Sequence, residues 1–236
     1  MPLFDLSEAH CPVDSTAVQQ VLEYFASEPW PSSEPSLGHS GTYGEVRPSG
    51  VRRLLDYMAS FAPVTRDDVF ADLGSGRGAV VAQVVLETSM KAIGVELSQK
   101  RAATASRVAQ RLEKVARQRL TLLQGDFLES HSWHNATLVY VNSAAFPVPL
   151  LFKLRSALQR LQPGSLALSV RRLPGCTRGL WPIGALSLPF NWARQVKVHA
   201  YMVAPGLDDQ NHTQLDWLSN YAPQPQVGLV SFGCRQ

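Results

Sequence analysis

The segment VFADLGSGRGAVV, residues 69–81, restricts the fold of this chain more than any other stretch. A short apolar run is followed at once by three glycines at alternate positions, Gly74, Gly76 and Gly78, and then by a second apolar run. Glycine adopts left-handed backbone conformations and lets another group approach the main chain, so several glycines rarely serve the turn alone. The segment therefore predicts a buried strand, a tight turn and a helix, with a ligand against the turn.

Short apolar runs and helical patterns alternate after this segment. The expected strands are 67–74, 91–96, 119–127, 136–142 and 163–170, and the expected helices between them are 78–88, 98–119 and 149–161. Strands that alternate with helices in this way are typical of a parallel sheet covered on both faces. The alternation then stops, and the runs 182–190 and 193–203 predict a closing antiparallel hairpin.

Two amphipathic segments precede the glycine turn. Residues 15–26 and 49–61 each place apolar side chains on one helical face, and a proline- and serine-rich break at 28–41 separates them. The last thirty residues are weakly patterned, and we expect one short helix and one strand there at most. These changes divide the chain into N-terminal helices with a covering loop (1–60), a core (61–205) and a C-terminal appendage (206–236).

Composition and charge exclude several classes of protein. The net charge is only +3, so a contact with nucleic acid would need a local basic patch. Cys11, Cys176 and Cys234 are widely spaced and odd in number, which fits neither a disulfide framework nor a zinc site. The chain starts without the basic and apolar regions of a signal peptide, and its apolar runs are too short to cross a bilayer. We expect an intracellular protein without a metal ion.

Two kinds of ligand fit the glycine turn, a dinucleotide and S-adenosylmethionine. GSGRGA fits the dinucleotide pattern GxGxxG/A, and Glu96, about twenty residues further on, would bind the ribose of either ligand. Asp72 favours S-adenosylmethionine, because a carboxylate at this place would repel a pyrophosphate but suits an ammonium group. Asp126 and Phe127, after the third expected strand, offer a carboxylate and a ring for the adenine.

An ordered set of motifs resembles one methyltransferase family. The motifs are YGE at 43–45, DLGSGRG at 72–78, GVE at 94–96, GDFL at 125–128 and VNSAAF at 141–146. They are similar to those of the non-SET histone-lysine methyltransferases called disruptor-of-telomeric-silencing (Dot-one) enzymes, over about residues 40–205. The resemblance implies a class I S-adenosylmethionine-dependent methyltransferase sheet of α/β class. It also implies a nuclear lysine N-methyltransferase that acts on the globular core of histone H3 in the nucleosome.

The resemblance assigns roles to individual residues. The YGE loop would close over the methionine part of the cofactor, and Asn142 corresponds to an asparagine beside the transferable methyl group. Tyr140 and Trp192 match aromatic residues of the family's lysine channel, and a further channel position falls on His199 or Tyr201. The expected catalytic residues are Asn142, Tyr140, Trp192 and Tyr201, and the expected cofactor-binding residues are Tyr43, Glu45, Asp72, Gly74, Ser75, Gly76, Gly78, Glu96, Asp126, Phe127 and Asn142.

The sequence departs from the family pattern at two places beside Asn142. Ser143 stands for the family's second asparagine and Ala144 for the following phenylalanine. These departures keep two alternatives open, a lysine methyltransferase for a non-histone protein and a cofactor-binding module without catalysis. Methylation of nucleic-acid bases is disfavoured, because no pair of prolines follows Asn142. The expected helix 99–119 carries seven basic residues, which would suit an acidic partner such as nucleic acid.

Overall fold

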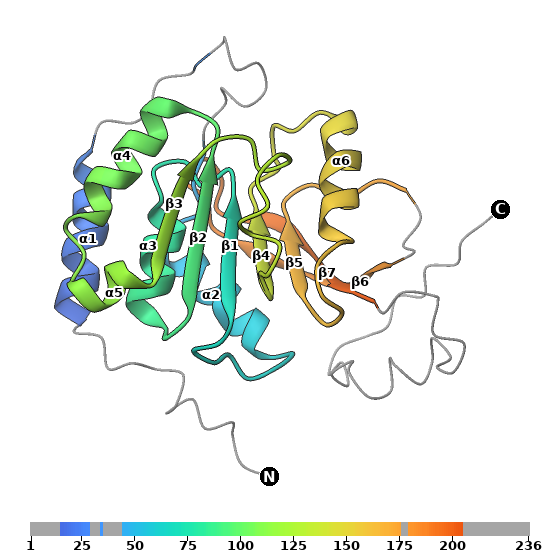
Figure 1. Cartoon of the computed structure of the whole chain (residues 1–236), viewed down its shortest axis with the longest axis horizontal. Coiled ribbons are helices and arrows are strands. Elements are labelled where there is room, and N and C mark those ends of the chain that lie inside the picture. The colour runs from blue at the N-terminus through green and yellow to red at the C-terminus, as the bar shows by residue number, and fades with distance from the viewer. Residues whose placement is uncertain (1–14, 29–33, 35–43, 176–178, 205–236) are drawn as a thin grey trace.

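A seven-stranded sheet with helices on both faces organises the parts of the chain that the computed structural model describes, residues 15–28, 34, 44–175 and 179–204 (Figure 1). The strand order is β3-β2-β1-β4-β5-β7-β6. Strands β1 to β5 run parallel, and β7 runs antiparallel to both β5 and β6. The strands are β1 (Val69–Leu73), β2 (Lys91–Glu96), β3 (Leu120–Gln124), β4 (Leu138–Val141), β5 (Leu166–Ser169), β6 (Leu180–Leu188) and β7 (Val196–Val203).

This arrangement confirms the predicted fold class, a mostly parallel sheet with a C-terminal antiparallel hairpin. Helices α2 and α3 lie behind the sheet and α6 lies in front of it (Figure 1). The helices are α1 (Ser15–Ser27), α2 (Pro48–Ala59), α3 (Ala79–Glu87), α4 (Gln99–Ala109), α5 (Lys114–Gln118) and α6 (Val148–Leu158). The predicted helix and strand of the C-terminal appendage fall outside the described residues.

Two hydrophobic clusters fill the space on either side of the sheet. One gathers buried residues of α1, α2 and α3 with Phe70 of β1 and Tyr140 of β4, and the other gathers α6 with Ala71 and Val139 from the same strands. Successive side chains of a strand point to opposite faces, so each parallel strand supplies both clusters. All five residues of β1 are therefore buried.

The single helix predicted over 98–119 is wrong, because the structure has two helices there. α4 ends at Ala109 and α5 begins at Lys114. One helix over this span would be about 30 Å long, but β3 spans only about 17 Å. A helix of that length would carry the chain past the point where β3 must begin beside β2. The turn between α4 and α5 lets the chain return to the start of β3. Arg119, directly after α5, fixes this point by donating hydrogen bonds to the carbonyl oxygens of Val85, Thr88 and Met90 at 2.6–2.9 Å.

A segment without regular helix, residues 125–137, covers part of the front face of the sheet beside α6 (Figure 1). Trp133 anchors it, since its side chain is fully buried and its Nε1 donates a hydrogen bond to the carbonyl oxygen of Phe127 at 2.8 Å. The same segment carries the expected adenine-binding residues Asp126 and Phe127, so its packing sets where those two residues lie.

Replacing Trp133 with alanine should lower the free energy of unfolding by about 3–5 kcal/mol, because it opens a large cavity and removes a buried hydrogen bond. Urea unfolding of the full chain measures this value. Trp192→Ala is the matched control, since that indole is 52% exposed and its loss should cost far less. Equal losses for both variants would contradict the anchoring role of Trp133.

The parallel strands place their carboxyl ends at one edge of the sheet. β1 lies between β2 and β4, so the strand order reverses between β1 and β4. Ligands of open α/β sheets bind at such a switch point, outside the carboxyl ends of the strands. In the described part of the chain, no helix is long and apolar enough to cross a membrane.

Candidate functional site

The glycine turn follows β1 at the switch point. Gly74, Gly76 and Gly78 have φ angles of 86°, 58° and 82°, which lie in the left-handed region that other residues avoid. The backbone N–H groups of Gly74 and Ser75 donate hydrogen bonds to the carbonyl oxygen of Val95 at 2.8 and 3.0 Å, which folds the turn onto β2. A Cβ atom on Gly74 would have nothing within 4 Å, so bare backbone faces open space there.

Three carboxylates surround this turn, and two of them have a buried arginine as partner. Glu96, at the end of β2, accepts hydrogen bonds from Gly76 N at 2.8 Å and from Arg101 Nε at 3.0 Å. Glu45 accepts two parallel hydrogen bonds from Arg77, both at 3.0 Å. Such side-by-side pairing is the strongest arrangement between arginine and a carboxylate. Both glutamates are therefore held in place, with their charge compensated, before any ligand binds.

Asp72, the third carboxylate, is buried at the floor of the turn. Its Oδ1 has no hydrogen-bond partner among the described residues, although the side chain is only 3% exposed. Burial raises the pKa of Asp72 well above its ordinary value, and the nearby charges of Glu96 and Glu45 raise that pKa further. A buried carboxylate without a partner is costly, so this place in the fold suits a cationic ligand.

Tyr140 and Asn142 complete the floor from the neighbouring strand. Tyr140 lies opposite Asp72 in the register of β1 and β4. The Tyr140 hydroxyl and the Asn142 Oδ1 are both buried without hydrogen-bond partners in the described structure, as is the Asp72 Oδ1. Burial, and secondly the charge of Asp72, raise the pKa of Tyr140 well above its ordinary value. These residues, Gly44, Glu45 and the glycine turn line one narrow pocket of about 20 Å³.

Gly44 joins this floor to the expected aromatic channel. The Nδ2 of Asn142 donates a hydrogen bond to the Gly44 carbonyl oxygen at 2.7 Å. Gly44 also lies against Trp192. A Cβ atom at position 44 would be 2.6 Å from the Trp192 Nε1, so only glycine permits this close contact. Trp192 packs its ring against Phe190 and stays half exposed. The structure thus brings Asn142, Gly44 and Trp192 together.

Tyr201 is not part of this group. Its side chain lies in the cluster under α6, on the face of the sheet opposite to Tyr140, and its hydroxyl accepts a hydrogen bond from Leu173 N at 2.9 Å. His199 shares that face and is half-buried, and burial lowers its pKa. The register pairs Tyr201 with Ala167 inside β5, whereas a channel residue should stand at the carboxyl end.

The expected adenine-binding residues stand beyond the end of β3. The Asp126 carboxylate accepts a hydrogen bond from Leu128 N at 2.9 Å, and the Phe127 ring stacks on Phe146 with centroids 5.9 Å apart. Both residues therefore occupy fixed positions near the edge where Glu96 ends β2. Tyr43 falls outside the described residues.

Ser143, one of the departures from the family pattern, has a structural role. It is fully buried, accepts a hydrogen bond from Arg171 N at 2.8 Å, and lies 2.7 Å from the Ser169 hydroxyl. These bonds tie the ends of β4 and β5 together. Ala144, the other departure, is exposed.

The buried arginines Arg77 and Arg101 were not among the expected site residues. Arg77 stands between two glycines of the turn, and Arg101 follows Glu96 by five residues on α4. Charged residues are almost never fully buried unless they are paired. The sequence showed the basic residues but gave no sign of which partners they would meet.

The basic stripe expected over 99–119 is smaller than the sequence suggested. Arg101 and Arg119 turn inward to Glu96 and to main-chain carbonyl oxygens, and Arg111 stacks on the Tyr24 ring at 3.8 Å. The residues of the stripe that stay exposed are Lys100, Arg107, Arg111, Lys114 and Arg117.

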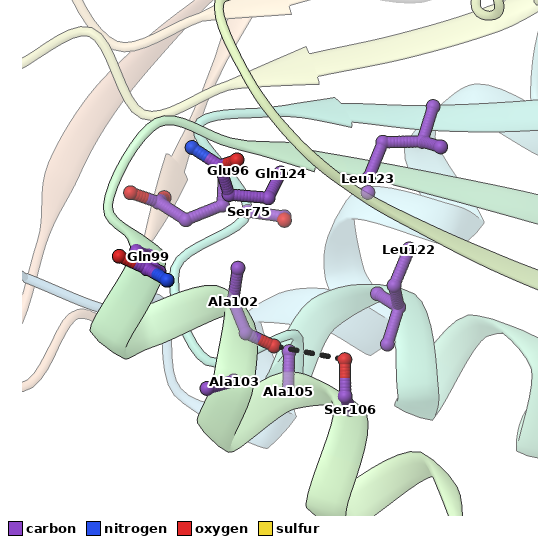
Figure 2. Close-up of a pocket in the computed structure, with 11 residues that line it drawn as sticks. Ser75, Glu96, Gln99, Ala102, Ala103, Ala105, Ser106, Leu122, Leu123 and Gln124 are labelled. Atoms are coloured by element: carbon purple, nitrogen blue, oxygen red, sulfur yellow. Dashed lines mark hydrogen bonds between the residues drawn. The ribbon is translucent and has the colours of Figure 1, made fainter.

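A second hollow, of about 330 Å³, lies between α4 and the edge strand β3 (Figure 2). Small side chains of α4, Ala102, Ala105 and Ser106, face Leu122 across it, and Ser75 and Glu96 line its polar end. The hollow thus adjoins the glycine turn from the α4 side. In the described parts of the chain, no three His, Cys, Asp or Glu side chains gather as a metal site would require.

Comparison with known proteins agrees with this geometry. Residues 36–178 match the family described as "Histone methylation protein DOT1". Two histone-lysine N-methyltransferases named as H3 lysine-79 specific are similar. The Drosophila melanogaster protein is 32% identical over 141 residues, which are 54% of this chain and 7% of that protein. The Caenorhabditis elegans protein is 30% identical over 146 residues, 57% of this chain and 15% of that protein. This chain therefore spans less than a sixth of either relative.

Solved structures support the fold. An O-methyltransferase from Bacillus cereus, crystallised with S-adenosylhomocysteine, superimposes with a TM-score of 0.54 at 13% identity. The match covers 80% of this chain and 91% of that one. At this identity the likeness establishes the class I methyltransferase fold and nothing about the substrate.

Proposed function

Because this chain belongs to the DOT1 family of histone methylation proteins, we propose that it transfers methyl groups from S-adenosylmethionine to a lysine in the globular core of nucleosomal histone H3. The observation that carries the cofactor assignment is the buried Asp72, whose Oδ1 has no partner in the described structure beside two glutamates that are already paired. A buried carboxylate at the floor of a glycine turn, with one oxygen unpartnered among the described residues, suits the single ammonium group of the cofactor's amino-acid end.

The remaining cofactor contacts follow from the positions of the side chains. Gly74 offers bare backbone to the amino-acid end, and the Oε2 of Glu96, which accepts the Gly76 N–H, faces the turn where ribose hydroxyls would bind. Asp126 and Phe127 stand at the next strand end for the adenine. When bound, S-adenosylmethionine supplies an activated methyl group on a sulfonium sulfur.

The lysine side chain would enter beside Trp192 and Asn142. A lysine ammonium has no lone pair, and its ordinary pKa is about 10.4, so the site must favour the neutral amine. The half-exposed Trp192 ring and the buried Tyr140 ring offer apolar walls that exclude water. The unpartnered Asn142 Oδ1 can accept a hydrogen bond from the amine and orient its lone pair, without the charge that would hold it as ammonium. Alignment rather than a general base then carries the reaction.

The contact with the nucleosome would involve the exposed basic side chains of α4 and α5. Five such residues are exposed; Lys100 and Arg107 lie within 4 Å of Glu34 and Glu28, and Arg111 stacks on Tyr24, while Lys114 and Arg117 are the exposed cations of α5. Their attraction to an acidic surface or to DNA is electrostatic and weakens with added salt. A nuclear location accords with such a substrate.

The test offers radiolabelled S-adenosylmethionine and the full chain to nucleosomes, free histones, bulk cell protein and nucleic acid in parallel. The expected result is label on nucleosomal histone H3, and mass spectrometry then identifies the lysine, with lysine-79 as the first position to examine. Arg52→Met, which removes an exposed ion pair between α2 and α3, should keep full transfer.

The other outcomes separate the alternatives. Label on a non-histone protein alone would keep the chemistry and replace the substrate. Cofactor binding without transfer to any acceptor would favour a cofactor-binding module. Absence of cofactor binding, checked by calorimetry, would overturn the proposal as a whole.

A further inference from the structure

Arg77 joins three segments of the chain at one buried point. Its side chain is 3% exposed. Nε and Nη2 donate to the two carboxylate oxygens of Glu45, each at 3.0 Å, and Nη1 donates to the carbonyl oxygens of Phe25 and Glu28 at 3.1 and 3.3 Å. The guanidinium therefore fixes the glycine turn, the loop at Glu45 and the end of α1 relative to one another.

The end of α1 is a suitable place for a cation. The last carbonyl oxygens of a helix lack partners within the helix and carry partial negative charge. Phe25 lies in the last turn of α1, which ends at Ser27, and its ring is buried in the core cluster together with Val18 and Val21. α1 is thus packed by its apolar face and joined to the glycine turn by Arg77.

The main chain around Glu45 is held by other bonds. Its backbone exchanges hydrogen bonds with Asn191: Glu45 N donates to the Asn191 Oδ1, and Asn191 N donates to the Glu45 carbonyl oxygen, both at 3.0 Å. These bonds place the main chain, whereas Arg77 holds both oxygens of the carboxylate. That carboxylate is close enough to Asp72 for the two charges to interact, so its direction affects the cofactor pocket.

We propose that Arg77 is a positioning residue that makes α1 part of the cofactor site, by holding Glu45 and the end of α1 against the glycine turn. This rests on the proposed cofactor. α1 precedes the region that matches the family, residues 36–178, so the inference extends the functional unit of this chain toward its N-terminus. Cofactor binding and the order of α1 are then coupled through one side chain.

The experiment uses the full chain and S-adenosylhomocysteine as the probe. Calorimetry measures its affinity for wild type, Arg77→Met, Arg77→Lys and Arg52→Met, at a temperature where each variant is folded by circular dichroism. Arg77→Met should lose affinity by roughly tenfold to a hundredfold, as supporting residues of binding sites do. Arg77→Lys, which keeps the charge but not the paired geometry, should fall in between. Arg52→Met, which removes an exposed Arg–Glu pair, should bind like wild type.

Hydrogen exchange provides a readout that a purely structural role would not change. In wild type the probe should slow the exchange of α1 amides, residues 18–27, and in Arg77→Met this protection should disappear while amides of α3 are still protected. Wild-type affinity in folded Arg77→Met would overturn the proposal. So would α1 exchange in wild type that ignores the probe, a result that needs no variant to fold. Failure of wild type to bind the probe would instead refute the proposed cofactor.

Discussion

Replacement of Asp72 by asparagine is expected to make the protein more stable and, at the same time, to remove most of its affinity for S-adenosylmethionine. The carboxylate is buried and its Oδ1 has no hydrogen-bond partner in the described structure. The neutral amide avoids the cost of a buried charge, which should raise the free energy of unfolding by about 1–3 kcal/mol at neutral pH. The same change removes the partner of the cofactor's ammonium, so affinity should fall roughly a hundredfold or more.

The pH dependence of stability checks the origin of this gain. In the folded protein the pKa of Asp72 is raised well above 3.8, so the folded state holds a proton that the unfolded chain has already released. Wild-type stability should therefore fall as pH rises from about 3.8 through the raised pKa, and stay lower above it. Asp72→Asn lacks this step. The two proteins should be equally stable at low pH and diverge as the pH rises.

Thermal unfolding across pH and calorimetry with S-adenosylmethionine measure the two effects. A variant that is less stable than wild type at neutral pH would contradict the view that Asp72 is held at a cost for ligand binding. A variant that is more stable but still binds with full affinity would place the ammonium elsewhere. Asp67→Asn, at an exposed position in the turn before β1, is the control for loss of a surface carboxylate.

Asn142→Ala should lower the rate of methyl transfer by roughly a hundredfold while cofactor affinity changes only a few-fold. Its Oδ1 is the buried acceptor that would orient the substrate amine, and misplacement of a reacting group by about 1 Å costs a factor of this size. The Nδ2 bond to Gly44 is lost as well, which accounts for the small change in binding.

Single-turnover transfer to nucleosomes and calorimetry separate the two contributions. The loss should lie in the rate at saturating cofactor rather than in the affinity. Ser132→Ala, at an exposed position whose hydroxyl pairs with that of Ser130, is a suitable control. Full transfer by Asn142→Ala would remove the residue from the catalytic group and leave Trp192 as the better candidate for the channel.

Local pattern predicted the fold class and the turn after β1, because both depend on residues that are adjacent in the sequence. The alternation of strands and helices predicted the succession of β1 to β5 along the chain but not their order in the sheet, and the glycine turn predicted a tight turn after β1, where Gly76 N now donates to Glu96. The break after Ala109 was missed. Helical periodicity continues across it, and periodicity does not show that a helix must end to match the length of the neighbouring strand.

Partners distant in sequence were the main omission. Arg77 meets Phe25 and Glu45 across 52 and 32 positions, and no local pattern shows such a contact. Tyr201 was assigned to the site by position in a motif, but the alternation of β7 turns its ring to the opposite face from Tyr140. Sequence spacing shows which residues of a strand share a face. Which face of the sheet they share depends on how the strand pairs with its neighbours.

The hydroxyl groups of Ser143 and Ser169 also limit which side chains fit between the ends of β4 and β5. Ser143 accepts the Arg171 N–H, and Ser169 donates to the Arg171 carbonyl oxygen at 2.9 Å, so the two buried serines close a ring with the main chain of Arg171. An asparagine at position 143 would be too large for that space while Ser169 remains. We therefore expect Ser143→Asn to destabilise the joined ends of β4 and β5, and a smaller residue at position 169 to relieve part of that loss.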